Sequence, residues 1–262
     1  MLKIGFIGTG NMATALIRAI KTDKKYVIIA SNKSNSKINK AKKELKIKTT
    51  NNKDLVKKSN IIFLCVKPKD MSEVLREIKS SVRNKIIVSI AAGIKISSIE
   101  KIIGKNRKIV RVMPNINCVV GEMAAAYSVN KNIKRNDKNI INKILNKAGI
   151  ALEIDENRMD AVTALSGSGP AFVAYLINNF TNSSIKYGLS KDVAYKLAIQ
   201  TFFGTSKLLK ETKIKPEELI KMVSSKKGTT VAGLEQFKKL KINQIIEKTI
   251  KASYKRSKEL GK

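Results

Sequence analysis

The N-terminal segment, residues 2–20, constrains the fold more than any other part of this sequence. An apolar run, Leu2–Ile7, leads into Gly8-Thr9-Gly10-Asn11-Met12-Ala13 and then into Asn11–Ile20, where apolar residues recur with helical spacing. A buried strand, a G-x-G-x-x-A turn and a helix in this order are typical of a dinucleotide-binding unit. The first glycine permits the turn, the second lets a pyrophosphate approach the backbone, and the alanine permits close helix–strand packing. The alternative, an ordinary glycine turn, explains this sequence context less well.

The first half of the chain continues this alternation of strand and helix patterns. Further buried strands are predicted at Tyr26–Ala30, Asn60–Val66, Ile86–Ile90 and Ile109–Met113, with helices at Ser36–Leu45 and Ser97–Ile103. Strands that alternate with helices form βαβ units with right-handed crossovers, which give a parallel sheet covered on both faces. We therefore expect an α/β Rossmann domain with a mostly parallel sheet over residues 1–155.

Helical periodicity dominates the second half of the chain, where strand patterns fade. Helices are predicted at Arg158–Leu165, Ala171–Tyr187, Lys191–Leu209, Pro216–Val223, Val231–Leu240 and Asn243–Leu260. The segment from Ala171 is apolar around much of its circumference, which is typical of a buried helix. A small domain has few other helices to pack around such an apolar helix, so we expect a second subunit to help cover it. Residues 156–262 are thus predicted to form an all-α dimerisation domain.

Residue counts exclude several kinds of catalytic site. The chain has no histidine, which excludes an imidazole base, a Ser-His triad and a histidine-bound zinc ion. Cys65 and Cys118 are its only cysteines, so a four-cysteine metal site is excluded as well. Both lie in apolar surroundings, which favours reduced buried thiols in a cytoplasmic protein. We expect no metal site.

The charge balance is strongly basic. Lys and Arg number 53 against 20 Asp and Glu, a formal net charge of +33. A nucleic-acid partner is one interpretation, because basic side chains release counterions from phosphates. We favour lysine as the default surface residue, since the charge is spread over every segment and aromatic residues make up only 5%. We expect no specific nucleic-acid partner, although the charge attracts anionic cofactors and substrates.

Neither a membrane segment nor a targeting signal is expected. No apolar run reaches the roughly 18 residues that a membrane-spanning helix needs. The opening residues, MLKIGFIGTGNM, lack the pattern of a secretory signal, namely a basic start, an apolar stretch and a cleavage site. The sequence therefore predicts a cytoplasmic protein with no membrane partner.

The end of the second predicted strand bears on the choice of dinucleotide. NAD sites usually place Asp or Glu there for the ribose 2′-hydroxyl, whereas this chain has Ser31-Asn32-Lys33. Two hydrogen-bonding side chains and a cation suit a 2′-phosphate, which favours NADPH over NADH. The alternative is that these residues form an ordinary loop in a lysine-rich protein.

Further motifs lie where ligands bind in related architectures. Val66-Lys67-Pro68 and Met113-Pro114-Asn115 end strands at the carboxyl edge of the sheet, where Asn115 is a candidate polar anchor near the nicotinamide. Proline also ends strands for structural reasons alone. Ser166–Ala171 (SGSGPA) permits close backbone approach. The Ser225–Thr230 loop opens a helix whose N–H groups can hold a carboxylate, and an ordinary threonine N-cap is an equally good interpretation.

Taken together, these motifs resemble those of pyrroline-5-carboxylate reductase, the last enzyme of proline synthesis. The resemblance is carried by IGFIGTGNMATAL, FLCVKPKDM, DAVTALSGSGPAFVAYLI and SSKKGTTVAGLEQF, in that order and over essentially the whole chain. It implies a Rossmann domain followed by a helical domain that intertwines with its partner in a homodimer, often within a larger ring. It also implies reduction of the cyclic imine L-1-pyrroline-5-carboxylate to L-proline by NAD(P)H.

The resemblance also assigns residues to the bound molecules. It places the pyrophosphate at Gly8, Thr9, Gly10, Asn11 and Met12, and the adenosine end at Ser31, Asn32, Lys33 and Asn52. It places the nicotinamide beside Cys65, Val66, Lys67, Pro68, Ala91 and Ala92. The substrate carboxylate is placed at the loop that contains Ser225, Gly228, Thr229 and Thr230, and Glu156 is a weaker candidate for the substrate pocket. The hydroxyl of Thr230 is expected to face the imine nitrogen, which makes Thr230 the candidate catalytic residue.

Two loops depart from the family pattern. The family usually reads M-P-N-T-P-A where this chain has Met113–Cys118 (MPNINC), and S-P-G-G-T-T where it has Ser225–Thr230 (SKKGTT). Proline fixes φ and glycine permits positive φ, so the second change leaves the conformation of this loop open. Lys226 or Lys227 could instead pair with the substrate carboxylate. One interpretation is neutral sequence drift in a lysine-rich chain, which we favour for Lys226. The other is that these changes weaken the activity or alter the ring substrate.

Two rival functions remain at this stage. One is a reductase of the same architecture that acts on another cyclic imine or on a β-hydroxyacid. The other is a non-enzymatic protein that binds NADP(H) or nucleic acid. Retention of Ser225, Gly228 and Thr230 argues against the non-enzymatic interpretation.

Overall fold

The computed structural model describes residues 1–261 and divides into two compact units. The first unit contains residues 1–168 together with the C-terminal residues from 253 onward, and the second contains Gly169–Ala252. The predicted boundary after residue 155 precedes this division. Residues 156–168 stay with the first unit because Glu156 accepts a hydrogen bond from Arg111 and the carbonyl of Ser166 accepts one from Asn115. Ser257 donates to Asp160 in turn, which keeps the C-terminal residues with them.

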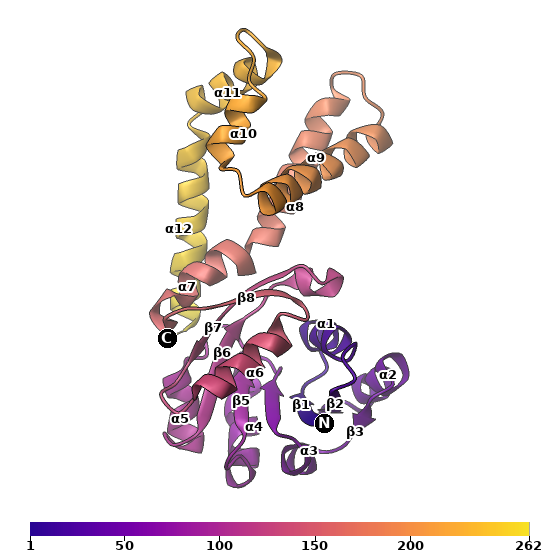
Figure 1. Ribbon diagram of the computed structural model, residues 1–262, viewed down its shortest axis with the longest axis vertical. Coiled ribbons are helices and arrows are strands. Elements are labelled where there is room, and N and C mark those ends of the chain that lie inside the picture. Colours follow the sequence, from indigo (N-terminus) through magenta and orange to yellow (C-terminus); the bar gives the residue numbers. More distant parts are fainter. Residues whose placement is uncertain (262) are drawn as a thin grey trace. The chain divides into compact units, whose positions relative to one another are not determined.

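An eight-stranded sheet forms the centre of the first unit (Figure 1). Its strand order is β3-β2-β1-β4-β5-β6-β7-β8, and the pairing is parallel throughout except between β6 and β7. The strands are β1 (Leu2–Ile7), β2 (Tyr26–Ser31), β3 (Lys48–Thr49), β4 (Ile61–Leu64), β5 (Ile86–Ser89), β6 (Lys108–Met113), β7 (Met123–Val129) and β8 (Gly149–Glu153). The predicted Rossmann architecture with a mostly parallel sheet is confirmed.

Helices cover both faces of this sheet and bury its apolar side chains in two clusters. One cluster contains residues of α1 (Asn11–Ile20), α2 (Asn35–Leu45) and α6 (Arg135–Leu145). The other contains residues of α3 (Asn52–Lys58), α4 (Met71–Ile78) and α5 (Ile96–Ile103). Between β1 and β4, the fully buried rings of Phe6 and Phe63 stack with centroids 4.8 Å apart. The strand ends that carry the predicted cofactor residues therefore rest on a closely packed core.

Short helical turns connect several of these elements. They are η1 (Pro68–Asp70), η2 (Lys79–Ser81), η3 (Ile116–Val120), η4 (Glu156–Arg158) and the π-helical turn η5 (Thr163–Gly167). The helix predicted at Arg158–Leu165 is thus divided into η4, the single turn α7 (Met159–Val162) and η5. The π-helical turn brings Gly167 close to Met113, where an added Cβ would lie 2.6 Å from the methionine methyl group. Gly167 therefore has a packing function, whereas an added Cβ at Gly169 would meet no atom within 4 Å.

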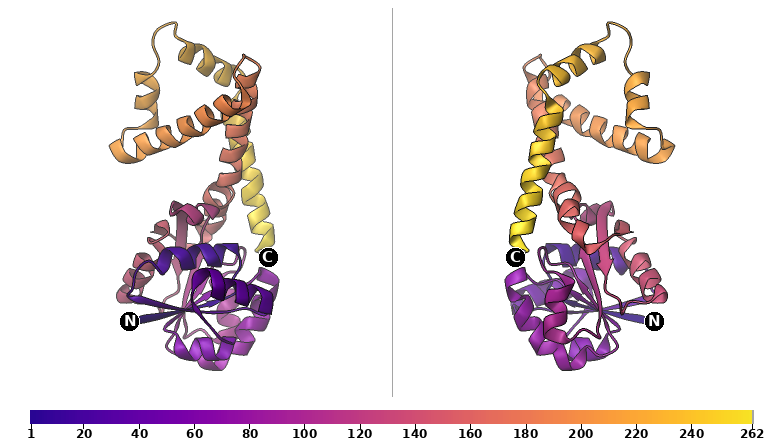
Figure 2. Two further views of the ribbon diagram at one scale, coloured as in Figure 1. Left: turned by 90° about the vertical axis from the view of Figure 1, so that its right-hand side faces the viewer. Right: turned by 90° about the vertical axis from the view of Figure 1, so that its left-hand side faces the viewer.

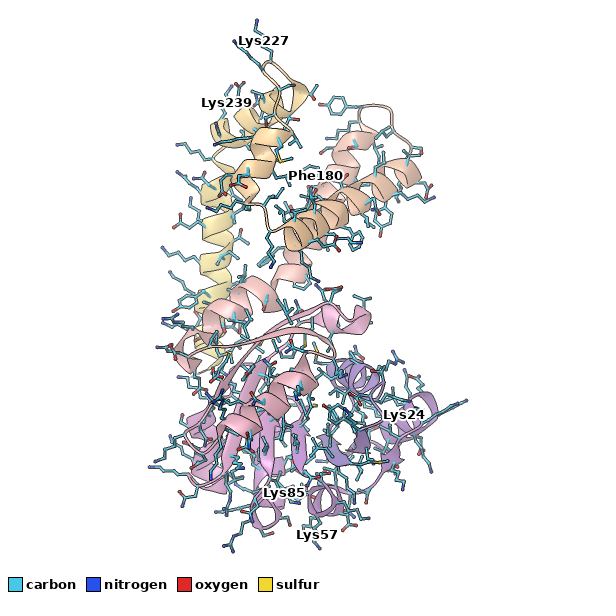
Figure 3. All side chains as sticks on the ribbon, viewed as in Figure 1. Lys24, Lys57, Lys85, Phe180, Lys227 and Lys239 are labelled. Atoms are coloured by element: carbon cyan, nitrogen blue, oxygen red, sulfur yellow. The ribbon has the colours of Figure 1, made fainter. Side chains whose placement is uncertain are left out.

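Helices make up the second unit, as predicted. They are α8 (Gly169–Ile185), α9 (Lys191–Thr212), α10 (Pro216–Met222), α11 (Thr229–Lys239) and α12 (Ile242–Leu260), of which α12 extends into the first unit. Figure 2 shows these helices in two further views. The rings of Phe180 on α8 and Phe202 on α9 meet edge to face, with centroids 5.4 Å apart. Figure 3 labels Phe180.

A single copy of the chain leaves the apolar side chains of α8 and α9 largely uncovered. Tyr175 is 69% exposed and Leu197 is 55% exposed, whereas Thr181 and Ala194 are the only buried residues among those described on the two helices. The expected burial of the helix from Ala171 is therefore not achieved within one chain. In the described part of the chain, no helix is long and apolar enough to cross a membrane.

Candidate active site

Gly8 holds three strand ends together at the carboxyl edge of the sheet. Its φ of +98° favours glycine, and an added Cβ would lie 2.7 Å from the carbonyl oxygen of Cys65. The Gly8 amide donates to the carbonyl of Ser31 over 2.8 Å, and the Cys65 amide donates to that of Ile7 over 2.8 Å. The turn after β1 is thereby fixed against the ends of β2 and β4, the location at which α/β sheets bind ligands.

Gly10 leaves open space at the N-terminus of α1. It is the N-cap residue, and an added Cβ would meet no atom within 4 Å. No side chain caps α1, and its first turn contains no acidic residue. An adjoining cavity of about 410 Å³ is lined, among others, by Thr9, Asn11, Arg18, Lys37 and Lys40. Glu44 also lines this cavity and pairs with Arg18 and Lys40, so the attraction for an anion comes mainly from the uncapped N–H groups and the helix dipole. These groups fit the pyrophosphate of a dinucleotide.

The residues predicted for the adenosine end lie together. Ser31 Oγ donates to Asn52 Oδ1 over 2.6 Å, although the two residues are far apart in the sequence. Asn32 Nδ2 donates to the hydroxyl of Thr9 over 2.8 Å, which joins this group to the glycine turn. Lys33 is exposed, and its Nζ lies 3.4 Å from a carboxylate oxygen of Glu73.

Sequence reasoning missed two carboxylates beside these residues. Asn52 Nδ2 donates to Glu77 Oε2 over 2.6 Å, and Glu73 is the partner of Lys33. Both glutamates belong to α4, where a spacing of four residues places them on one side of the helix. This spacing is the only sequence feature that indicates a pair of carboxylates on one helix face. It does not indicate which residues the two carboxylates contact.

The segments predicted for the nicotinamide side follow two neighbouring strands. Cys65–Pro68 follow β4 and Ala91-Ala92 follow β5, and Leu64 is paired with Ser89 where these strands end. Burial raises the pKa of the Cys65 thiol and raises that of Cys118 to about 11, because an apolar environment disfavours the thiolate. Both thiols are therefore protonated at neutral pH and serve as small apolar groups.

Glu156 forms a partly buried ion pair with Arg111 in the first unit. Its Oε1 accepts from Arg111 Nη1 over 3.1 Å and from the backbone N–H of Ile96 over 2.8 Å. Arg111 is only 7% exposed, so its charge needs this partner. These contacts give Glu156 a structural function in joining β6 to the start of α5. Its assignment to the substrate pocket stays a prediction.

Asn115 also makes structural contacts. Its side chain is 4% exposed, donates to the carbonyl of Ser166 over 3.1 Å and accepts from the amide of Ala124 over 3.1 Å. The side chain thus connects the end of β6 to the π-helical turn and to β7. Sequence reasoning treated Asn115 as a candidate anchor for the nicotinamide and did not identify this connection.

The Ser225–Thr230 loop of the second unit forms a tight turn before α11. The Gly228 amide donates to the carbonyl of Ser225 over 2.9 Å, and Lys227 between them has a φ of +62°. Lys227 therefore occupies the left-handed conformation that glycine adopts most readily. Figure 3 shows its side chain at the outer end of the loop. The turn thus places a lysine where the backbone conformation favours glycine.

The N-terminus of α11 has the properties of an anion site. Gly228 is the N-cap residue, no side chain caps the helix, and its first turn, which includes Thr229 and Thr230, has no acidic residue. The positive end of the helix dipole therefore faces the turn without a compensating charge from this segment. The first turn supplies N–H groups and two hydroxyls of the kind that bind a small carboxylate.

Comparisons with known proteins agree with this arrangement. The family described as pyrroline-5-carboxylate reductase dimerisation matches residues 156–260, and that described as NADP oxidoreductase coenzyme F420-dependent matches residues 3–93. Pyrroline-5-carboxylate reductase of Aquifex aeolicus is 36% identical over 99% of this chain and 97% of the relative.

Solved structures of similar proteins cover both units. Pyrroline carboxylate reductase of Plasmodium falciparum with NADP bound is 32% identical, has a TM-score of 0.88, and aligns over 100% of this chain and 98% of its own. A pyrroline-5-carboxylate reductase from Coxiella burnetii is 29% identical, has a TM-score of 0.94, and aligns over 99% of this chain and 98% of its own.

The two glycines of the N-terminal turn are expected to respond differently to alanine. Gly10→Ala places a methyl group in open space, so we expect an unchanged melting temperature but at least tenfold weaker binding of NADPH. Gly8→Ala forces a methyl group against the Cys65 carbonyl and should lower the melting temperature itself. Thermal unfolding and calorimetric titration measure the two effects. Full NADPH affinity in Gly10→Ala would contradict the proposed approach of the pyrophosphate.

Lys227 and its neighbour provide a matched test of the turn. Lys227→Gly relieves a left-handed lysine, so we expect stabilisation by up to about 1 kcal/mol. Lys226→Gly should destabilise by about 0.5–1 kcal/mol, because glycine adds backbone freedom to the unfolded chain without relieving a positive φ. Urea unfolding at one protein concentration compares them. Equal loss of stability in both variants would show that the turn does not require positive φ at residue 227.

Proposed function

The chain belongs to the pyrroline-5-carboxylate reductase family, and we propose that it reduces L-1-pyrroline-5-carboxylate to L-proline with NAD(P)H, the last step of proline biosynthesis. The observation that carries the proposal is the turn with Gly8 and Gly10 at the start of α1, which leaves space for a phosphate. The chain that contains it is related to these reductases over 99% of its length. The uncapped start of α11 supports it with a second site that suits an anion.

The nucleotide fits the residues of the first unit. The cofactor, when bound, supplies the hydride for the reduction. The N–H groups at Asn11 and Met12 hold its pyrophosphate, and Ser31, Asn32, Lys33 and Asn52 meet its adenosine end. Cys65, Val66, Lys67, Pro68, Ala91 and Ala92 line the nicotinamide side. We propose NADPH as the main cofactor and NADH as a second one.

The substrate is proposed to bind through its carboxylate at the start of α11. Ser225, Gly228 and Thr229 contribute to the turn and the helix N-terminus that hold this group, and the hydroxyl of Thr230 bonds to the ring nitrogen. A protonated imine is already electrophilic, so reduction needs no strong general acid. This agrees with a chain that contains no histidine. The main contribution of the protein is to hold the cofactor and the imine in the correct relative orientation. Such positioning can lower the activation free energy by about 7–11 kcal/mol.

The assembly is proposed to be a homodimer with intertwined helical domains, and larger rings of dimers are a further expectation. Support comes from the match of residues 156–260 to a dimerisation family and from the uncovered apolar side chains of α8 and α9. A second copy that covers these side chains would remove them from water, which favours association. The proposed biosynthetic function and the two unpaired cysteines suit the cytoplasm.

Steady-state kinetics test the reaction and the function of Thr230. Purified protein should oxidise NADPH only when L-1-pyrroline-5-carboxylate is present. Thr230→Ala should lower kcat by about tenfold or more with unchanged NADPH affinity, because the hydroxyl that orients the ring nitrogen is lost. Thr230→Ser keeps this hydroxyl and should retain most of the activity. An unchanged kcat in Thr230→Ala would remove the residue from the mechanism. Tight NADPH binding without turnover would favour a different cyclic imine as substrate.

Sedimentation velocity tests the assembly. We expect the wild-type protein to sediment as a dimer or a multiple of dimers at micromolar concentration. Leu197→Glu introduces a charge on the uncovered face of α9 and should weaken association at least tenfold. The neighbouring Lys196→Gln changes an exposed polar residue and is the matched control. A monomeric wild-type protein would contradict the proposed dimer.

A further inference from the structure

A carboxylate lies beside the adenosine residues although the end of β2 has none. Residues 31–33 read Ser-Asn-Lys, where many NAD sites have Asp or Glu. In the folded chain, Glu77 of α4 occupies this neighbourhood and accepts a hydrogen bond from Asn52 Nδ2 over 2.6 Å. Glu73, one turn earlier on α4, lies 3.4 Å from the Nζ of Lys33.

The contact to Glu77 is part of a short chain of hydrogen bonds. Ser31 is 1% exposed and donates its hydroxyl proton to Asn52 Oδ1 over 2.6 Å. The oxygen of the Asn52 amide is thus directed to Ser31, and its nitrogen is directed to Glu77. Because Ser31 is the last residue of β2, these bonds connect α4 to the strand end where a ribose is expected.

We propose that Glu77, supported by Glu73, limits the preference of this protein for NADPH by supplying from α4 the carboxylate that the end of β2 lacks. This rests on the proposed function, which places the adenosine ribose beside Ser31 and Asn52. Glu77 is a specificity-determining residue: it selects between cofactors and takes no part in the transfer of hydride.

Two physical effects give Glu77 this function. A carboxylate accepts a hydrogen bond from the 2′-hydroxyl of NADH but repels a 2′-phosphate, which carries about −1.5 to −2 charges at neutral pH. The phosphate would also compete with Glu77 for the N–H groups of Asn52, which already donate to this carboxylate over 2.6 Å.

Glu73 acts in the same direction through Lys33. The lysine is the cation nearest to the end of β2 in sequence, and its ammonium already faces the Glu73 carboxylate. Glu73 and Glu77 are both exposed, but the contact from Glu73 to Lys33 is longer than the contact from Glu77 to Asn52, 3.4 Å against 2.6 Å, so the influence of Glu73 is the smaller of the two. Together the two glutamates offset, at this one position, the attraction that the net charge of +33 exerts on phosphates.

Calorimetric titration with two cofactor fragments isolates this effect. The probes are adenosine 2′,5′-bisphosphate and 5′-AMP, which differ only in the 2′-phosphate, and each titrates the full chain at about 150 mM salt to screen distant charges. Glu77→Gln should raise the affinity for the bisphosphate relative to 5′-AMP by about fivefold or more. Addition of Glu73→Gln should raise this ratio further.

A matched control removes the same charge at a distant position. Glu153 lies on β8, at the opposite edge of the sheet from β2 and β3, where it pairs with Lys138. Glu153→Gln should leave the ratio of the two affinities unchanged. The ratio also separates a direct contact from a structural one, because a general loosening of the site would weaken both probes alike.

Two outcomes overturn the proposal. A ratio in Glu77→Gln within twofold of the wild-type value contradicts it, and an equal rise in affinity for both probes is one form of that result. Failure of the wild-type chain to bind either probe contradicts the proposed adenosine site itself, and the inference falls with it. An unchanged ratio with normal binding of both probes leaves the proposed reductase function intact.

Discussion

The close approach of Gly8 to the Cys65 carbonyl is the constraint on which the rest of the site depends. It brings the ends of β1, β2 and β4 together, so that α1 begins at the carboxyl edge of the sheet with uncapped N–H groups. Any side chain at Gly8 would separate these ends, and the phosphate cradle would be lost with them. The stacked rings of Phe6 on β1 and Phe63 on β4 hold these two strands together within the core.

Both proposed anion sites are formed by the uncapped N-terminus of a helix. The start of α1 in the first unit and the start of α11 in the second each have a glycine as N-cap, no capping side chain and no acidic residue in the first turn. Backbone N–H groups and a helix dipole would hold a phosphate in the first proposed site and a carboxylate in the second. Such sites need no histidine or metal, which explains how a chain without histidine can position two anionic molecules.

Much of this arrangement could be predicted from the sequence, because local patterns determine it. Continuous apolar runs such as Ile61–Leu64 mark central parallel strands. Strand β7 was not predicted, since its alanines and serine give a weak strand signal. The bond between Asn52 and Glu77 could not be foreseen, because it joins residues that only the packing of α3 and α4 brings together. Likewise, the sequence alone left the conformation of the Ser225–Thr230 loop open, and the structure gives Lys227 a positive φ.

Transfer of an isotopic label tests the central claim most directly. NADPH with deuterium at both hydrogens of the nicotinamide C4 carbon, incubated with the protein and L-1-pyrroline-5-carboxylate, should yield L-proline that carries one deuterium at the former imine carbon. Mass spectrometry of the product detects the label. Proline formed without deuterium, or no proline in the presence of bound NADPH, would contradict direct reduction of this imine by the chain.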